Sequence, residues 1–165
     1  MARSYLEERP MGTDLELEGF EVLSRQECGV LLSRGCVGRV GFVVGGRPQV
    51  LPVNYGADDA GVVVFRTSAN SILVAVAMQA VVFEVDGLDE AHRTGWSVCV
   101  HGSAREITER DDPIAERLRT LAVIPWAPGH RQRWFAVTPA EITGRRLPVQ
   151  GMAEGLGGWY PGIPS

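Results

Sequence analysis

Short runs of β-favouring residues, joined by tight turns, constrain the fold of this 165-residue chain more than any other feature. Residues 37–44 and 48–55 are two such runs, and the glycine pair Gly45-Gly46 between them predicts a β-hairpin. A third run, residues 62–67, follows a second turn. Because these connections are too short to hold a crossover helix, we expect the strands to pair antiparallel.

Further strands are predicted at residues 80–86, 96–107, 134–137 and 141–143. With the first three runs they make six or seven short strands around one hydrophobic core. A sheet of that size tends to close on itself, because closure removes its exposed edges. The sequence therefore predicts a mainly β (α+β) protein, built as a small antiparallel barrel with a few short helices.

Two of the expected helices carry clear terminal signals. Ser24 and Glu27 have the spacing of a capping box, which predicts a helix that ends at Gly35. A second helix is expected over residues 112–122, where an aspartate cap is followed by a proline at the first helical position.

By composition the chain divides into a polar arm at residues 1–19, one globular domain at 20–147, and a tail at 148–165 that is rich in glycine and proline. We expect the arm to be flexible and the tail to be irregular. No apolar run approaches the ~18 residues of a membrane span, and no hydrophobic segment follows the N-terminal residues as in a secretory signal. A cytoplasmic protein without a membrane partner is therefore expected.

Charge and composition exclude several function classes. The net charge of -4 argues against general nucleic-acid binding. All 16 basic residues are arginine, so a Schiff-base lysine and a Walker-type phosphate loop are impossible. The scattered histidines predict no metal site. Cys28, Cys36 and Cys99 are expected to be reduced and mostly buried thiols.

Residues 62–71, with the sequence VVVFRTSANS, carry the most chemistry. A strand ends there and a short helix over residues 70–78, capped by Ser68 or Asn70, is expected to follow. The polar side chains at this junction are Arg66, Thr67, Ser68, Asn70 and Ser71. Free N–H groups at a helix start favour an anion, so the junction is a candidate phosphate site. An ordinary strand end with a helix cap explains the same residues.

Two tryptophans and one cysteine–histidine pair are further candidates. Trp96 begins a strand, and Trp126 lies in a loop near Arg131, so an aromatic ring and a guanidinium could stack on a flat ligand. Tryptophans also fill hydrophobic cores. Cys99 and His101 share one face of a strand, which allows a thiolate and a base but needs no catalytic reason.

Five segments, in this order, carry a family resemblance: GRVGFVVGGRPQVLPVNY, VVVFRTSANS, VVFEVDGLDEAHRTGWSVCVHGSA, PWAPG and EITGRRL. Over residues 22–147 the chain resembles the pyridoxamine 5'-phosphate oxidase-like, FMN-binding split-barrel proteins. It looks closest to the small branch of flavin-nucleotide-binding and nitroimidazole-reductase-like members. The resemblance implies a six-stranded split barrel that forms a homodimer, with FMN bound at the dimer interface.

The resemblance also implies roles for particular residues. Those facing the flavin ring would be Pro52, Val53, Asn54 and Tyr55, and those holding the ring edge, ribityl chain or phosphate would be Arg66, Thr67, Ser68, Asn70 and Ser71. Trp96 and Ser97 would stand near the same site, and Trp126 and Arg131 could reach it from the partner subunit. Ile72 departs from the family pattern, which commonly has a lysine there.

The function implied by the resemblance is a flavin-dependent oxidoreductase, which takes a hydride from NADH or NADPH and passes electrons to a small-molecule acceptor. A deazaflavin coenzyme is an alternative to FMN, and its acidic tail would need a basic channel. Candidates for that channel are Arg131, Arg133, Arg145 and Arg146. Two other functions stay open: a flavin or small-ligand binding protein without turnover, and a dimeric barrel without a cofactor that serves protein interaction.

Overall fold

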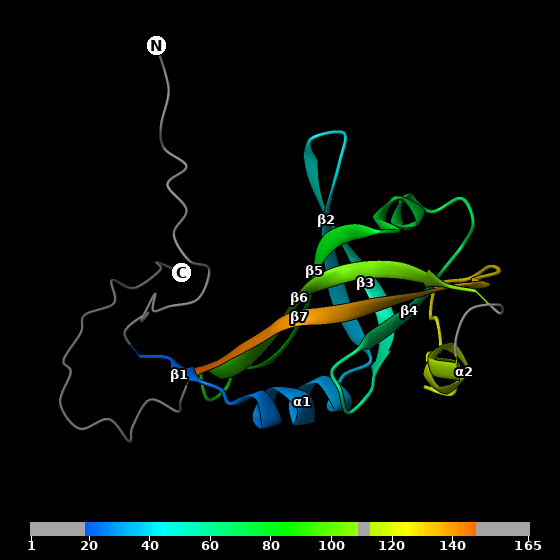
Figure 1. Ribbon diagram of the computed structural model, residues 1–165. Coiled ribbons are helices and arrows are strands. Elements are labelled where there is room, and N and C mark those ends of the chain that lie inside the picture. The colour runs from blue at the N-terminus through cyan, green and yellow to red at the C-terminus, as the bar shows by residue number, and fades with distance from the viewer. Residues whose placement is uncertain (1–18, 109–112, 148–165) are drawn as a thin grey trace, which may run out of the picture.

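The computed structural model describes residues 19–108 and 113–147, and the predicted N-terminal arm and C-terminal tail lie outside these ranges except for Gly19 (Figure 1). Its strands are β1 (Glu21–Val22), β2 (Val37–Val44), β3 (Arg47–Ala57), β4 (Val63–Thr67), β5 (Gln79–Asp89), β6 (Thr94–Ile107) and β7 (Arg133–Leu147). They form one antiparallel sheet in the order β1-β7-β4-β3-β2-β5-β6. Because β6 also pairs with β7, six strands close into a ring, which confirms the predicted barrel.

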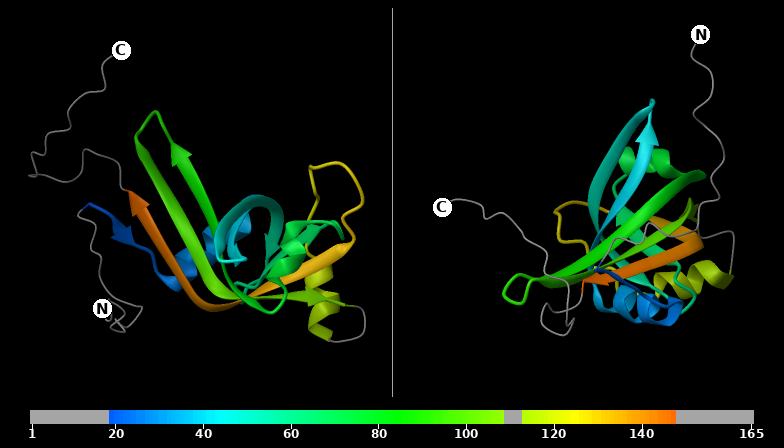
Figure 2. Two further views of the ribbon diagram at one scale, coloured as in Figure 1. Left: turned by 90° about the horizontal axis from the view of Figure 1, so that it is seen from above. Right: turned by 90° about the vertical axis from the view of Figure 1, so that its left-hand side faces the viewer.

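Two hairpins extend from the body of this barrel. The β2–β3 hairpin rises above the body in Figure 1, and the β5–β6 hairpin extends to another side in Figure 2. Gly45 and Gly46 form the first tip with φ angles of 57° and 75°, and Val44 pairs with Arg47 across it. These left-handed angles are the reason for the glycine pair, so the predicted hairpin is confirmed.

The first predicted helix is confirmed, and the other two differ in detail. Helix α1 (Arg25–Arg34) begins after Ser24, where both hydrogen bonds of the capping box are present. The segment expected to be helical over 70–78 is a short 3-10 helix, η1 (Ile72–Val76). Its cap is Ser71 rather than Ser68 or Asn70, because the Ser71 hydroxyl accepts the N–H of Leu73. Helix α2 (Pro113–Arg119) is shorter than expected.

The two strands predicted at 134–137 and 141–143 are in fact one strand, β7. Its register against β6 shifts at one point: Glu141 pairs with His101 but Pro139 pairs with Gly102, which leaves Ala140 as an extra residue. The proline therefore marks a β-bulge, where its missing N–H is tolerated, and not a chain break. Gly102 is required there, since a Cβ atom would lie 2.0 Å from the Thr138 carbonyl oxygen. The short strand β1 was not predicted.

Two hydrophobic clusters stabilise the barrel, one inside it and one on its outer surface. Phe65, Phe83 and Phe135 are fully buried in the interior cluster, and α1 adds Leu31 and Leu32 to it. The outer cluster lies between the sheet and α2 and consists of Val64, Ile107, Ala115, Leu118, Val123 and Ala136. Since alternate residues of a strand face opposite sides, β4 and β7 contribute to both clusters.

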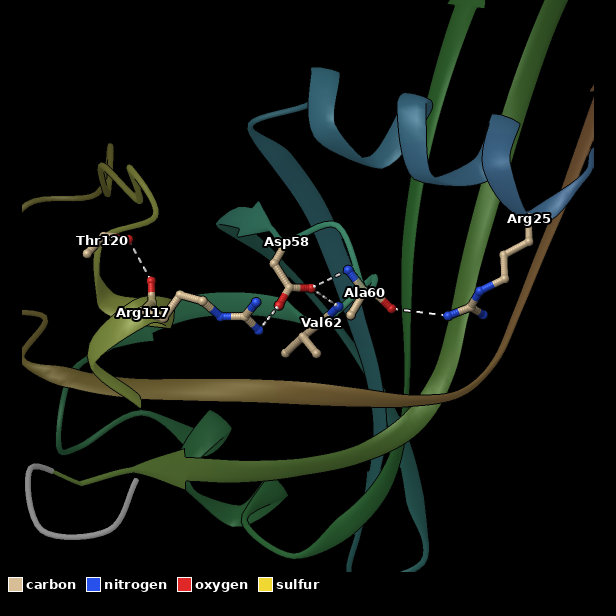
Figure 3. Close-up of polar contacts among 6 residues, drawn as sticks. All are labelled: Arg25, Asp58, Ala60, Val62, Arg117 and Thr120. Atoms are coloured by element: carbon tan, nitrogen blue, oxygen red, sulfur yellow. Dashed lines mark hydrogen bonds and ion pairs between the residues drawn. The ribbon is translucent and has the colours of Figure 1, made fainter. Parts of the chain in front are cut away.

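The turn between β3 and β4 ties both α-helices to the sheet (Figure 3). Asp58 Oδ1 accepts the N–H groups of Ala60 and Val62 at 3.0 and 2.9 Å, and Asp58 Oδ2 accepts from Arg117 Nη2 of α2 at 2.7 Å. Arg25 of α1 donates to the Ala60 carbonyl at 3.1 Å. The turn is thus a fixed corner that sets where α2 and the loop after it begin.

The three cysteines differ in how far they are exposed to solvent. Cys28 is buried and Cys99 is half-buried, but Cys36 is exposed, so the expectation of buried thiols was wrong for Cys36.

Within the described ranges no helix is both long and apolar enough to cross a membrane.

Candidate functional site

The four residues of β3 assigned to the flavin ring divide between the two faces of the sheet. Val53 and Tyr55 point into the barrel and are buried, whereas Pro52 is exposed and Asn54 half-buried on the outer face. The Tyr55 hydroxyl donates to the Leu32 carbonyl at 2.8 Å, and burial raises the pKa of Tyr55 to about 12. Val53 and Tyr55 therefore serve the core in this protomer.

Asn54 connects β3 to the loop between α2 and β7. Its Nδ2 donates to the Cys36 carbonyl at 3.3 Å, and its Oδ1 accepts the main-chain N–H of Trp126 at 2.8 Å. The Trp126 side chain stays 72% exposed. The structure thus brings Asn54 and Trp126 together within one protomer.

Arg66 makes a second connection to the same loop. Its Nε donates to the Arg131 carbonyl at 3.0 Å, and its guanidinium lies over the Trp134 ring, 4.9 Å from the ring centroid. The side chain of Arg131 in turn donates to Ala127 within the loop at 3.3 Å. Arg66 and the loop that carries Trp126 and Arg131 are therefore in contact within one protomer. That Trp126 and Arg131 reach the site of a partner subunit stays a prediction.

Thr67 points to the opposite face from Arg66, because neighbouring residues in a strand alternate. It is fully buried, and within the described part of the chain its Oγ1 has no hydrogen-bond partner. An unpaired buried hydroxyl costs about 1–3 kcal/mol, which a bound acceptor would relieve. The chain itself closes this hydroxyl off from solvent, so a ligand would reach it only after a local shift.

Arg133, the cross-strand partner of Thr67, is bound by a carboxylate. Its Nε donates to Glu106 at 2.6 Å, its Nη2 forms a second contact with the same carboxylate, and its guanidinium lies 5.8 Å from the Phe135 ring centroid. Hydrogen bonding from Arg133 lowers the pKa of Glu106. Arg133 is thus neutralised by Glu106, and Arg131 is the better candidate for an anion.

The segment after β4 is open to solvent at several positions. Asn70 is exposed, Ser68 and Ser71 are half-buried, and Ile72 is 45% exposed. Ile72 is therefore not a core residue, and a longer polar side chain fits at this position. Ser71 already uses its hydroxyl as the cap of η1.

Trp96 and Ser97 line a separate hollow of about 640 Å³ beside the tip of the β5–β6 hairpin. The indole of Trp96 lies over Gly87, where a Cβ atom would come within 2.6 Å of the ring. Glu84 and Asp86 also line the hollow, and both form ion pairs with Arg39. The hollow thus combines aromatic and aliphatic side chains with charges of both signs, since Arg93 and Arg145 line it as well.

Arg66, Arg131 and Trp134 form what we call the Arg66 cluster. This cluster and the Trp96 hollow lie at opposite ends of β6. Ile107 ends this strand and pairs with Trp134, the residue beneath Arg66, whereas Trp96 lies near the start of the strand. The eleven residue steps between Trp96 and Ile107 span about 36 Å along the strand. One protomer therefore separates Trp96 and Ser97 from Arg66. Pro52 is nearer to the hollow, because its cross-strand partner Arg39 binds Glu84 and Asp86.

The four arginines of the expected channel divide in the same way. Arg133 begins β7 and Arg131 lies in the loop just before it, whereas Arg145 and Arg146 lie near the end of β7, opposite Ser97 and Trp96. Within one protomer they do not line a single channel.

The remaining candidates give no sign of activated chemistry. Burial is the main cause that raises the pKa of the Cys99 thiol, which disfavours the thiolate that a nucleophile needs. No group of three or more histidine, cysteine or acidic side chains in the described residues is placed to hold a metal.

Sequence reasoning missed two aromatic contacts at the site. Trp134 lies beneath Arg66, and the Trp96 ring packs over Gly87, which has no side chain to obstruct it. Both are cross-strand relations, since Arg66 pairs with Trp134 and Gly87 with Trp96. The strand register is the signal that would have found them, and a single sequence does not contain it.

Comparison with known proteins gives consistent matches over the barrel. A family model described as pyridoxamine 5'-phosphate oxidase matches residues 24–146. An uncharacterized protein of Mycobacterium tuberculosis is 34% identical over 130 residues, which cover 76% of this chain and 84% of that protein. Solved structures are similar as well, and two serve as examples. An FAD binding protein from Mycobacterium smegmatis is 34% identical with a TM-score of 0.66, over 76% of this chain and 98% of that one. A conserved protein of unknown function from Corynebacterium diphtheriae is 28% identical with a TM-score of 0.65, over 79% of this chain and 99% of that one.

Proposed function

Since this chain belongs to the pyridoxamine 5'-phosphate oxidase family, we propose that it binds a flavin nucleotide and acts as an oxidoreductase on a small molecule. The observation that carries the proposal is the arrangement of Asn54, Arg66, Trp126 and Arg131 on one outer surface. The loop that carries the exposed indole of Trp126 also carries Arg131, and an aromatic ring with a guanidinium in one loop suits a ligand that is both planar and anionic. The similar FAD binding protein from Mycobacterium smegmatis supports a flavin as that ligand.

The residues present fit a flavin nucleotide. Trp126 would cover the ring system, Arg131 would attract the phosphate, and Ser68, Asn70 and Ser71 would offer polar groups beside it. A bound flavin would supply hydride and electron transfer, while the protein orients it and shields it from water.

FMN is the flavin that we propose first, with FAD as the nearest alternative, because a relative of 34% identity binds FAD. A deazaflavin with an acidic tail is disfavoured. Its tail would need continuous positive charge, but Arg133 is paired with Glu106, and Arg145 and Arg146 lie at the other end of β7.

We further propose that the flavin site is shared between two copies of this chain. The Trp96 hollow is too far along β6 to serve the Arg66 cluster of its own protomer, but a partner could supply it. An outer face that is largely apolar suits such a contact and forms a hollow of about 810 Å³. It is lined by residues of five strands that include Gly41, Val43, Pro48, Val50, Val82, His101 and Pro139.

Separate titrations with FMN, FAD and a deazaflavin, read by flavin fluorescence, test the proposal. The expected result is saturable binding of FMN or FAD at one flavin per chain, followed by flavin reduction when NADH or NADPH is added. Binding without reduction by either nucleotide would instead assign a flavin-binding protein without turnover. Failure of all three flavins to bind would overturn the proposal.

A further inference from the structure

The loop between α2 and β7, residues 120–132, is attached to the barrel at its root and again near its tip. At the root Leu121 packs on Gly56 of β3, where a Cβ atom would lie 3.2 Å from the Leu121 Cβ. Asn54 lies two residues before Gly56 and so on the same face of β3. Its Oδ1 accepts the N–H of Trp126 at 2.8 Å. Gly56 and Asn54, on one face of β3, thus contact the loop at two points: Gly56 at its root and Asn54 nearer its tip.

Strand β4 supplies the other attachment. Arg66 Nε donates to the Arg131 carbonyl at 3.0 Å, and stacking over Trp134 holds the guanidinium plane in place. The two hydrogen bonds bracket residues 127–130. The main chain is therefore held on both sides of the loop tip, while the Trp126 indole stays 72% exposed. Such an indole is preorganised, because a ligand that contacts it does not have to order the loop first.

We propose that Asn54 and Arg66 are positioning residues: they hold the 120–132 loop so that Trp126 covers the ligand, and they do not contact the ligand themselves. Both polar atoms of the Asn54 amide are engaged by the main chain, at Cys36 and at Trp126. The Nε and the planar face of Arg66 are engaged as well. This inference rests on the proposed function, because a flavin is the ligand in two of its three tests.

A double-mutant cycle measures whether Asn54 acts through Trp126. Asn54→Ala, Trp126→Ala and the double variant are titrated with FMN. We expect each single substitution to raise the Kd about tenfold and the double variant to be no weaker than the weaker single one. Additive effects, about hundredfold in the double variant, would mean that Asn54 contacts the flavin directly and would overturn the proposal.

Arg66→Lys separates charge from positioning. Lysine keeps the positive charge but lacks the planar group that donates to Arg131 while stacking on Trp134. We expect Arg66→Lys to lose as much FMN affinity as Arg66→Ala. Wild-type affinity in Arg66→Lys, together with weak binding by Arg66→Ala, would show direct attraction of the phosphate and would contradict the positioning role.

A measurement without flavin keeps this inference distinct from the proposed function. The flavin-free protein is labelled with 5-fluorotryptophan, and the ¹⁹F resonance of Trp126 is the one that Trp126→Phe removes. We expect Asn54→Ala and Arg66→Lys to move this resonance toward that of a mobile indole. Asn54→Asp, which keeps the acceptor for the Trp126 N–H, and the exposed loop control Gln132→Ala should leave it in place. An unmoved resonance in Asn54→Ala would overturn the inference even if FMN binds, whereas an absence of flavin binding alone would overturn only the proposed function.

Discussion

Neighbouring residues of β3 and β4 have different roles because a strand presents alternate side chains to opposite faces. Tyr55 completes the core, while Asn54 beside it holds the loop that carries Trp126. Thr67 is buried, while Arg66 beside it stacks on an outer tryptophan. A motif of consecutive residues therefore does not form one continuous binding surface, and each role has to be read from the face on which the residue lies.

The buried phenol of Tyr55 predicts a loss of stability at alkaline pH. Its pKa is raised to about 12 in the folded protein, against about 10 for an exposed tyrosine. The neutral phenol therefore contributes its full stability below about pH 10, and this contribution is lost as the pH rises toward 12.

Urea unfolding at about pH 8 and about pH 11 measures this effect. The free energy of unfolding should fall between the two, and the fall should be smaller in Tyr55→Phe, which has no phenol to ionise. Tyr55→Phe should also be about 1 kcal/mol less stable at the lower pH, because it loses the hydrogen bond to Leu32. Equal pH dependence in both proteins would contradict the burial of this phenol as the cause.

Ile72→Lys tests the departure from the family pattern. Ile72 is 45% exposed, so lysine should be accepted there without loss of thermal stability. If a flavin phosphate lies beside Ser71, the new charge should tighten FMN binding about tenfold at low salt and less at high salt.

The neutral variant Ile72→Gln is the matched control, and it should bind FMN like the wild type. Equal affinity of Ile72→Lys and Ile72→Gln, in folded proteins, would place the phosphate away from the start of η1.

At the scale of elements, the β3–β4 turn is the joint that fixes α2. Asp58→Ala removes the acceptor of two main-chain N–H groups and of Arg117, so we expect a loss of about 2–3 kcal/mol in the free energy of unfolding. Asp58→Asn keeps the acceptor for the two amides and should lose less than about 1 kcal/mol, since the Arg117 partner is 60% exposed and its ion pair is screened.

Chemical denaturation compares these variants with Asp59→Ala, a change at the exposed neighbour. That control should stay within about 0.5 kcal/mol of the wild type. If Asp58→Ala were equally mild, the turn would not be what holds α2 in place.

Elements whose signals lie within a few neighbouring residues could be predicted from the sequence, whereas features that depend on how strands pair could not. The capping box of α1 and the Gly45-Gly46 hairpin are encoded within a few residues, and both are confirmed. The continuity of β7 through Pro139 depends on a bulge opposite Gly102, which requires the position of β6. The candidate site has the same limit. The sequence shows the residue types of the site. The face on which each residue lies depends on strand register, and so does the position of Trp134 under Arg66.

At the scale of the whole molecule, the closed barrel separates the Arg66 cluster from the Trp96 hollow, and a second copy would reunite them. The exposed face that we propose for this contact includes Val43 and Val50, which are 52% and 63% exposed. Burial of such a surface stabilises association.

Light scattering at micromolar concentration should therefore give twice the chain mass of 17.9 kDa. Val50→Glu places a charge on this face and should shift the protein to monomers, with loss of flavin binding. Val30→Glu, at an exposed valine of α1, should leave the dimer intact. A wild-type mass near 17.9 kDa would contradict the shared site.

A mixed dimer shows whether two protomers together form each flavin site. Chains with Arg66→Ala and chains with Trp96→Ala, each with a different affinity tag, are produced together, and the doubly tagged dimer is isolated and titrated with FMN. If the site combines the Arg66 cluster of one protomer with the Trp96 hollow of its partner, one of the two sites carries both substitutions and the other is intact. This dimer is then expected to bind FMN with wild-type affinity at about half the wild-type capacity, although neither homodimer does. If the mixed dimer binds no better than the two homodimers, the site lies within a single chain and the account is contradicted.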